Sequence, residues 1–169
     1  MAKKFTRGLA SLKFGTPTDL ATMPTTLTEV GWSKEGTVTI SIGEPDKTEI
    51  FIEEADTPLR TLYGSREISI DVETYDTSPD NLAIMFGGSV TTGKWTPDAA
   101  ISADDQAIEI QTRSDSGKAM KISIPKASIM ASMSGNLTKK DGLSIKFKIN
   151  PQIVVSGTAP WTWEEVTVV

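Results

Sequence analysis

The residues best suited to chemistry in this chain are its paired carboxylates, because carboxylates can act as general acids, general bases and calcium ligands. Two pairs are adjacent in sequence, Asp104-Asp105 and Glu164-Glu165. Neighbours in an extended strand point to opposite faces, so neither pair should converge on one atom as glycosidase acids must. We interpret both pairs as solvated surface.

Two further segments have the composition of a binding loop. The acidic run Glu53-Glu54-Ala55-Asp56 offers oxygen ligands but lacks the Asp/Asn/Gly alternation of a recognised calcium loop. Gly87-Gly88-Ser89 is rich in glycine but lacks the Lys-Ser/Thr of a phosphate-binding loop. The first is better explained as surface and the second as the end of a helix.

The 169-residue chain contains no cysteine and no histidine. Disulfides, thiolate nucleophiles, Ser/His/Asp triads and ordinary zinc or iron sites are therefore excluded. We expect a protein without catalytic activity, bound metal or cofactor, whose function depends on its surfaces.

The charge and the apolar segments restrict the partners. The formal net charge of −5 argues against a protein that grips nucleic-acid phosphates, although nucleic acid could still slide past it. No run approaches the roughly 18 apolar residues of a membrane span. The basic start of the chain lacks the apolar stretch of a signal peptide, so we expect a protein made in the cytoplasm with no membrane partner.

The elements that must position these residues are β-strands, because apolar and polar side chains alternate in several short runs. The apolar positions are Val38, Ile40, Ile42; Ile68, Ile70, Val72; Ile108, Ile110; Met120, Ile122, Ile124; and Leu143, Ile145, Phe147, Ile149. Short turns at 43–46, 115–117 and 135–142 separate them and predict antiparallel neighbours. The fold class predicted is mainly β, an antiparallel β-sandwich or split barrel.

One segment departs from this pattern and predicts a short flanking α-helix. Ser78-Pro79-Asp80-Asn81 has a capping residue, a proline at the first helical position and an acid near the helix start. Leu82, Met85 and Phe86 follow at helical spacing, and Gly87-Gly88 ends the helix. We expect these three side chains to pack on the β-core.

Residues 1–25 show no sustained period and are predicted to form an extended N-terminal arm, with residues 26–169 as a single β-sandwich domain. A solvated tail is the simple interpretation. The alternative is an arm that becomes ordered against a neighbouring subunit, favoured by its interspersed apolar residues Phe5, Leu9, Leu12, Phe14, Leu20 and Met23. Such an arm should be removable without loss of the fold.

The strand at residues 67–73 carries the clearest functional pattern. Its apolar residues belong to the core, which leaves Glu67, Ser69, Asp71 and Glu73 in a row on the other face. Ordinary solvent exposure explains such a row. If several copies formed a ring with this face inward, the negative lining would repel phosphate and let DNA pass.

The tryptophans suggest a different function. Trp161 and Trp163 share a face of a C-terminal strand, and Trp32 and Trp95 lie beside turns. Such rings could form the stacking platform of a carbohydrate- or ligand-binding module. They could equally be buried in the core or in a subunit contact, which the flanking Val166 and Val168 favour.

The order of these parts resembles the major tail tube proteins of long-tailed bacteriophages. The similarity lies in the layout: a basic arm, the segment 23–32, the strand 36–41, an acidic hairpin region containing Asp56-Thr57-Pro58-Leu59, and the lone helix 78–86 ending in Gly-Gly. Tube proteins of contractile tails and of type VI secretion systems are similar in the same way.

The resemblance implies a structural virion protein that is assembled in the host cytoplasm. It implies a homo-oligomer, with hexameric rings stacked into a tube, contacts to other phage tail proteins, and a channel through which DNA passes without specific binding. The subunit interface would include Phe5, Leu9, Phe14, Met23, Pro45, Arg60 and Tyr63. Glu67, Asp71 and Glu73 would line the channel.

Overall fold

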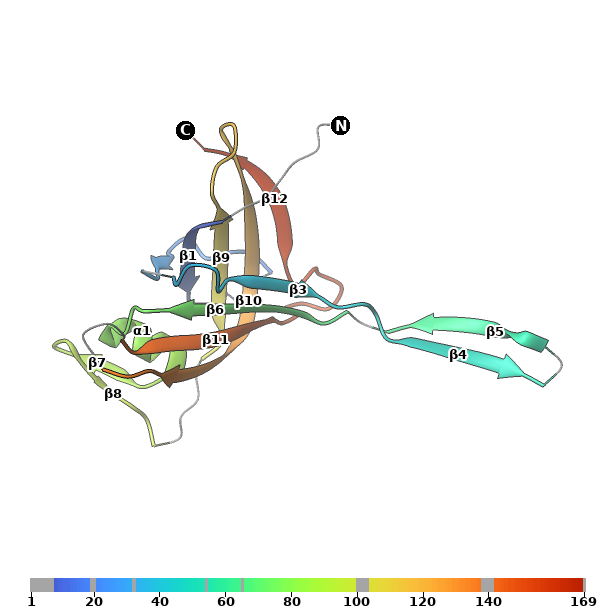
Figure 1. Ribbon diagram of the computed structural model, residues 1–169, viewed down its shortest axis with the longest axis horizontal. Helices are drawn as coiled ribbons and strands as arrows, with labels where there is room; N and C mark the ends of the chain where they lie inside the picture. The colour runs from blue at the N-terminus through green and yellow to red at the C-terminus, as the bar shows by residue number, and fades with distance from the viewer. Residues whose placement is uncertain are drawn as a thin grey trace.

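The computed structural model describes residues 8–18, 21–31, 33–53, 55–64, 66–99, 104–137 and 142–168. The chain is mainly β with antiparallel pairing and one short helix, which confirms the predicted fold class (Figure 1). The elements in order are β1 (Leu9–Gly15), β2 (Thr28–Glu29), β3 (Thr39–Ile42), β4 (Lys47–Ile52), β5 (Ala55–Tyr63), β6 (Ile68–Thr74), α1 (Pro79–Phe86), β7 (Ser89–Thr91), β8 (Lys94–Thr96), β9 (Gln106–Thr112), β10 (Lys118–Ser134), β11 (Ser144–Pro151) and β12 (Thr162–Thr167).

The long strand β10 connects two groups of strands. Its first half pairs with β9 on one edge and with β12 on the other, up to Ser123. From Ala127 onward it pairs with β11 instead. Pro125 lies between the stretch of β10 that pairs with β12 and the stretch that pairs with β11. At this point a residue without a backbone N–H costs no ladder hydrogen bond. β10 therefore belongs to two groups of strands. One group has the order β2-β1-β9-β10-β12, and the other has the order β10-β11-β6-β3.

The two groups cross each other and enclose one apolar core (Figure 1). The Phe14 ring of β1 meets the Phe147 ring of β11 edge to face, with ring centres 5.9 Å apart. The fully buried isoleucines come from both groups: Ile108, Ile110, Ile122 and Ile124 from one, and Ile70, Ile145 and Ile149 from the other. The predicted period-two patterns of these strands are confirmed.

Helix α1 covers one end of the core as predicted. Met85 is buried, and Leu82 and Phe86 are partly buried against the core. The Ser78 side chain makes no capping hydrogen bond; the Asp76 carboxylate instead accepts one from the Ser78 N–H at 3.0 Å. After the helix, Gly88 has φ +98° and passes so close to the Thr96 carbonyl that a Cβ would lie 2.4 Å from that oxygen.

The pairing expected across the turn at 43–46 is wrong. β3 does not pair with the following strand but with β6, for example Ile40 opposite Ile70. Among the residues that the structure describes, β4 pairs only with β5, and the β4–β5 hairpin extends away from the body (Figure 1). The partner of β3 is β6, which follows the hairpin in the sequence. A pairing between such distant segments cannot be predicted from the residues next to β3.

The prediction of an arm over residues 1–25 is wrong for Leu9–Gly15. This segment is β1, paired with β2 on one edge and with β9 on the other. Leu12 and Phe14 are each 1% exposed, so Phe14 is a core residue and not a subunit contact. Leu9 also packs on this core, and Met23 is partly buried. Phe5, Leu20 and Trp32 lie outside the described residues.

Replacing Phe14 by alanine should lower the free energy of unfolding by about 3–5 kcal/mol, because it leaves a cavity where the two groups of strands meet. Denaturant unfolding measures the change. The matched control is Phe51→Ala, since Phe51 is 56% exposed on the hairpin; its effect should stay within about 0.5 kcal/mol. Equal effects of the two variants would contradict this placement of β1.

Candidate functional site

The β4–β5 hairpin exposes more apolar side chains than any other element described. They are Ile50 (43%), Phe51 (56%), Ile52 (41%), Leu59 (66%), Leu62 (40%) and Tyr63 (69%). Side chains alternate between the two faces along each strand, and residues directly opposite each other share a face. Ile50 and Leu62 therefore lie on one face of the hairpin, and Tyr63 lies on the other. An isolated two-stranded hairpin is marginally stable in water, and exposed apolar side chains on both of its faces are typical of interaction surfaces.

The hairpin also contains two of the residues predicted to contact neighbouring subunits, and a third lies just before it. Tyr63 and Arg60 are exposed on β5, and Pro45 is partly buried in the segment that leads into β4. Residues 44–67 contain seven acidic and three basic side chains, a formal charge of −4 out of −5 for the whole chain. The hairpin is therefore both apolar and acidic.

A second apolar surface lies at the root of the hairpin, where β3 and β6 leave the body. A crevice there is lined by Ile40, Ile42, Ile68, Ile70, Ile122, Ile124, Pro151, Trp161 and Trp163. Its volume is about 10 Å3, room for at most one water molecule and no ligand. Ile42 at its edge is 46% exposed, and Ile153 (63%) and Val155 (44%) lie in the segment between Pro151 and Trp161.

The tryptophan pair does not form a flat platform. The rings of Trp161 and Trp163 are 6.4 Å apart and inclined at 66°, and Trp161 packs on the core. Trp95 donates its indole N–H to the Gly87 carbonyl at 2.9 Å and lies near Phe86. These contacts favour packing within the fold over a sugar-stacking surface.

The outer face of the strands β3, β6, β11 and β10 is polar. Asp71 lies directly opposite Thr39 and Lys148, and Glu73 lies opposite Lys146. A shallow groove of about 290 Å3 crosses this face, lined by Thr37, Asp71, Val72, Glu73, Met130, Ser132, Lys146, Phe147 and Lys148. The predicted row of Glu67, Ser69, Asp71 and Glu73 does lie opposite the core-facing residues of β6.

The sequence predicts a negative row, but in the structure lysine side chains lie among the acids. Lys148 forms an ion pair with Glu67 at 3.7 Å, and Lys146 faces Glu73 across the ladder. Only Glu67 and Asp71 are exposed, whereas Ser69 and Glu73 are each 8% exposed. Glu73 lies on this face, but its carboxylate is held by neighbouring side chains and is not a free charge. The lysines come from β11, which lies far from β6 in sequence.

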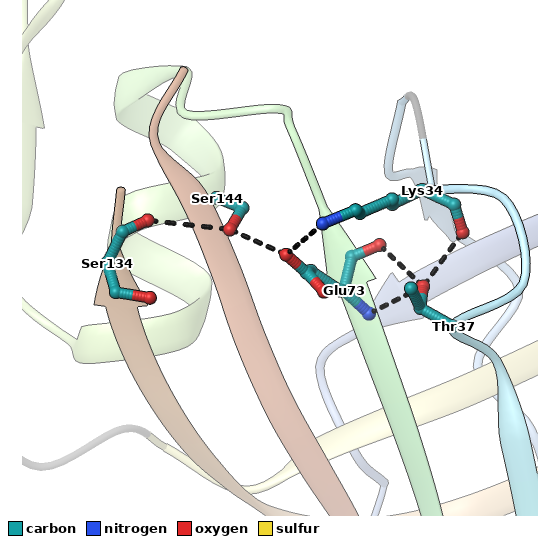
Figure 2. Close-up of polar contacts among 5 residues, drawn as sticks. All are labelled: Lys34, Thr37, Glu73, Ser134 and Ser144. Carbon is teal, nitrogen blue, oxygen red and sulfur yellow. Dashed lines mark hydrogen bonds and ion pairs between the residues drawn. The ribbon is translucent and has the colours of Figure 1, made fainter. Parts of the chain in front are cut away.

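Glu73 is the centre of a polar network that joins three segments (Figure 2). Its Oε1 accepts hydrogen bonds from the Ser144 hydroxyl at 2.7 Å and from the Lys34 ammonium at 3.0 Å. Thr37 Oγ1 accepts the Glu73 backbone N–H at 3.3 Å and donates to the Lys34 carbonyl at 2.8 Å. The network fastens the segment before β3 to β6 and β11.

The same contacts change the acidity of both charged groups. The hydrogen bonds from Ser144 and then Lys34 lower the pKa of Glu73 below its ordinary value of 4.5, against the opposing effect of burial. The hydrogen bond with Glu73, followed by one with Tyr75, raises the pKa of Lys34. Both groups are therefore charged over the whole neutral range, which suits a structural ion pair and not proton transfer.

The adjacent carboxylates of the sequence take separate partners. Glu164 pairs with Lys121 at 2.7 Å and Glu165 pairs with Lys118. Asp105 pairs with Lys126 at 3.1 Å. Over the described ranges, no three acidic side chains are placed to hold a metal ion, and no helix is long and apolar enough to span a bilayer.

In comparisons with known proteins, no family model matches the sequence and no curated protein is significantly similar to it.

Glu73→Gln should lower the free energy of unfolding at neutral pH by on the order of 1 kcal/mol, because a neutral amide loses a charge-assisted hydrogen bond to Lys34. Since the folded pKa of Glu73 is lowered, the unfolded chain takes up the proton first as the pH falls. The difference from wild type should thus persist above pH 4.5 and shrink below it, measured by denaturant unfolding at several pH values. Glu67→Gln is the control, because the Glu67 side chain is 81% exposed; a difference that grows on acidification would contradict the network.

Proposed function

We propose that this chain is a structural subunit that self-assembles into rings stacked as a bacteriophage tail tube. The observation that carries the proposal is the β4–β5 hairpin, which extends away from the body (Figure 1). Its apolar side chains are exposed, whereas those of the body are buried. Covering these side chains would contribute about 25 cal/mol per Å2 of apolar area removed from water. A monomer gains none of this, so the hairpin favours a protein that works as an assembly.

The sheet edges support the same proposal. Among the described residues, β3 pairs on one edge only, with β6, so its other edge offers backbone groups to a neighbour. Adding a strand to such an edge is a common mode of protein association. In a ring, edge pairing between copies would extend the strands β3, β6, β11 and β10 into a continuous channel wall.

The polar outer face of these strands suits a channel for DNA. Its acidic residues are balanced by Lys146 and Lys148 across the ladder, and between them lie serine and threonine side chains. Such a face lacks the unpaired basic cluster that binds phosphates. A ring of six chains would also carry a total charge on the order of −30, six times −5, which would repel DNA.

Light scattering and negative-stain electron microscopy of the concentrated protein test the proposal. Rings or hollow tubes are the expected result for the wild type. Phe51→Asp combined with Leu59→Asp should abolish them while leaving the unfolding free energy nearly unchanged, because the hairpin pairs only with itself. Leu137→Asp is the control, since Leu137 is 83% exposed outside the hairpin. Assembly of the double hairpin variant would refute the role of the hairpin.

A charge change on the polar face tests the channel. In assembled tubes, Asp71→Lys should produce retention of short DNA that weakens steeply with added salt, because the substitution leaves three lysines in a row across β6 and β11. Asp80→Lys makes the same charge change on helix α1, away from this face, and should not retain DNA. Equal retention by the two variants would show that this face does not line the bore.

A further inference from the structure

Residues 37–42, Thr37-Val38-Thr39-Ile40-Ser41-Ile42, have the composition of a segment that pairs with copies of itself. All but Ser41 are β-branched, and none is charged, proline or glycine. Short segments of this kind are the sequence signature of cross-β association when a sheet edge exposes them. The segment does lie at such an edge, because among the described residues β3 pairs only with β6.

The regular pairing with β6 nevertheless ends before the first two residues of this segment. Thr39 lies opposite Asp71, and the next bridge along β6 joins Thr74 to Ser33. Five residues, 34–38, therefore face the two residues 72 and 73 of β6, which leaves three extra residues in the edge strand. This bulge is larger than the single extra residue of a common one, and bulges interrupt the ladder at sheet edges.

The extra residues form a turn that is held by Glu73 (Figure 2). The Thr37 N–H donates to the Lys34 carbonyl at 3.4 Å, and Gly36 has φ +76°. The Lys34 N–H donates to the Glu73 carbonyl at 2.8 Å. The Glu73 N–H donates to the Thr37 hydroxyl oxygen at 3.3 Å. A side chain thus replaces the backbone carbonyl that a regular ladder would supply.

We infer that the turn 34–37 is an edge stop, which confines strand addition at β3 to the four residues of that strand. The stop keeps the first two residues of the segment out of the ladder and places the charged Lys34 and Glu35 at its end. Bulges, charged side chains and short edge strands are the devices by which proteins prevent uncontrolled edge pairing. The stop acts in the free subunit, so the inference does not depend on the tail tube proposal.

The opposite end of β3 is closed in a similar way. Glu44 and Pro45 follow the strand within three residues, and proline has no N–H to donate to an added strand. Charged residues and proline on both sides of a β-prone segment are typical gatekeepers against association. The turn 34–37 differs from them because it also removes two β-prone residues from the edge.

Deleting residues 34–36 tests the stop, because it removes the three extra residues. Each residue of the edge strand would then face one residue of β6, from Ser33 opposite Thr74 to Ile42 opposite Ile68. The free edge would grow from four residues to seven, namely Ser33 followed by residues 37–42.

The deletion variant should fold, because Val38 would keep its packing on the core. We expect it to associate at an about tenfold lower concentration than the wild type, measured by sedimentation velocity. Hydrogen exchange monitored by mass spectrometry should then show slower exchange of backbone amides within residues 37–42 in the associated form than in the monomer.

Gly36→Val tests the stop without changing the length of the chain. A valine at φ +76° is strained and favours extended backbone, and nothing beyond its chain neighbours lies within 4 Å of the added Cβ. Gly93→Val is the matched control, because Gly93 has φ +74° and equally open surroundings between β7 and β8. Both variants should be destabilised in denaturant unfolding, but only Gly36→Val should associate at a lower concentration.

Folded deletion and Gly36→Val variants that associate only at the wild-type concentration would overturn the inference. Association that slows exchange elsewhere and leaves residues 37–42 unchanged would overturn it as well. If the deletion variant does not unfold cooperatively, the comparison of Gly36→Val with Gly93→Val decides. Wild-type tubes combined with a negative result would leave the proposed function standing. A monomeric wild type combined with a Gly36→Val variant that associates through residues 37–42 would support the stop and count against the tube.

Discussion

The fold depends on one strand serving two groups of strands. β10 pairs with β12 up to Ser123 and with β11 from Ala127, and Pro125 lies at the change of partner. Because one continuous backbone belongs to both groups, their apolar faces are held over each other, and Phe14 meets Phe147 between them. The outer face of β6 and β11, which we propose lines a channel, is positioned by the same strand.

The hairpin and the body differ in how far their apolar side chains are buried. In the body, isoleucine and phenylalanine side chains are almost completely removed from water. In the hairpin the same residue types remain 40–69% exposed, so they contribute less to the stability of a monomer. A sequence that places such residues on a two-stranded ribbon is understandable if burial occurs only on association, when the ordering cost is offset by the new contact.

The hairpin region and the body also differ in their formal charge. Residues 44–67 have a formal charge of −4, whereas β10 and β11 carry lysines. Within the body the acids are neutralised locally, as Glu73 is by Lys34 and Glu164 is by Lys121. The polar face is consequently neither a strong cation nor a strong anion surface.

The sequence by itself determined the local features: the β class, the strands with alternating residues, the turn between β9 and β10, and helix α1, because each depends on spacings of a few residues. It also identified the side of β6 on which Asp71 lies. Only the tertiary structure decided that Leu9–Gly15 is a core strand, that β3 passes over the hairpin to pair with β6, and that Lys34 and Ser144 hold Glu73. The apolar crevice at the root of the hairpin likewise combines residues from β3, β6, β10 and β12. These features join residues distant in sequence, and such pairings are selected by the burial of the whole core, which no local pattern encodes.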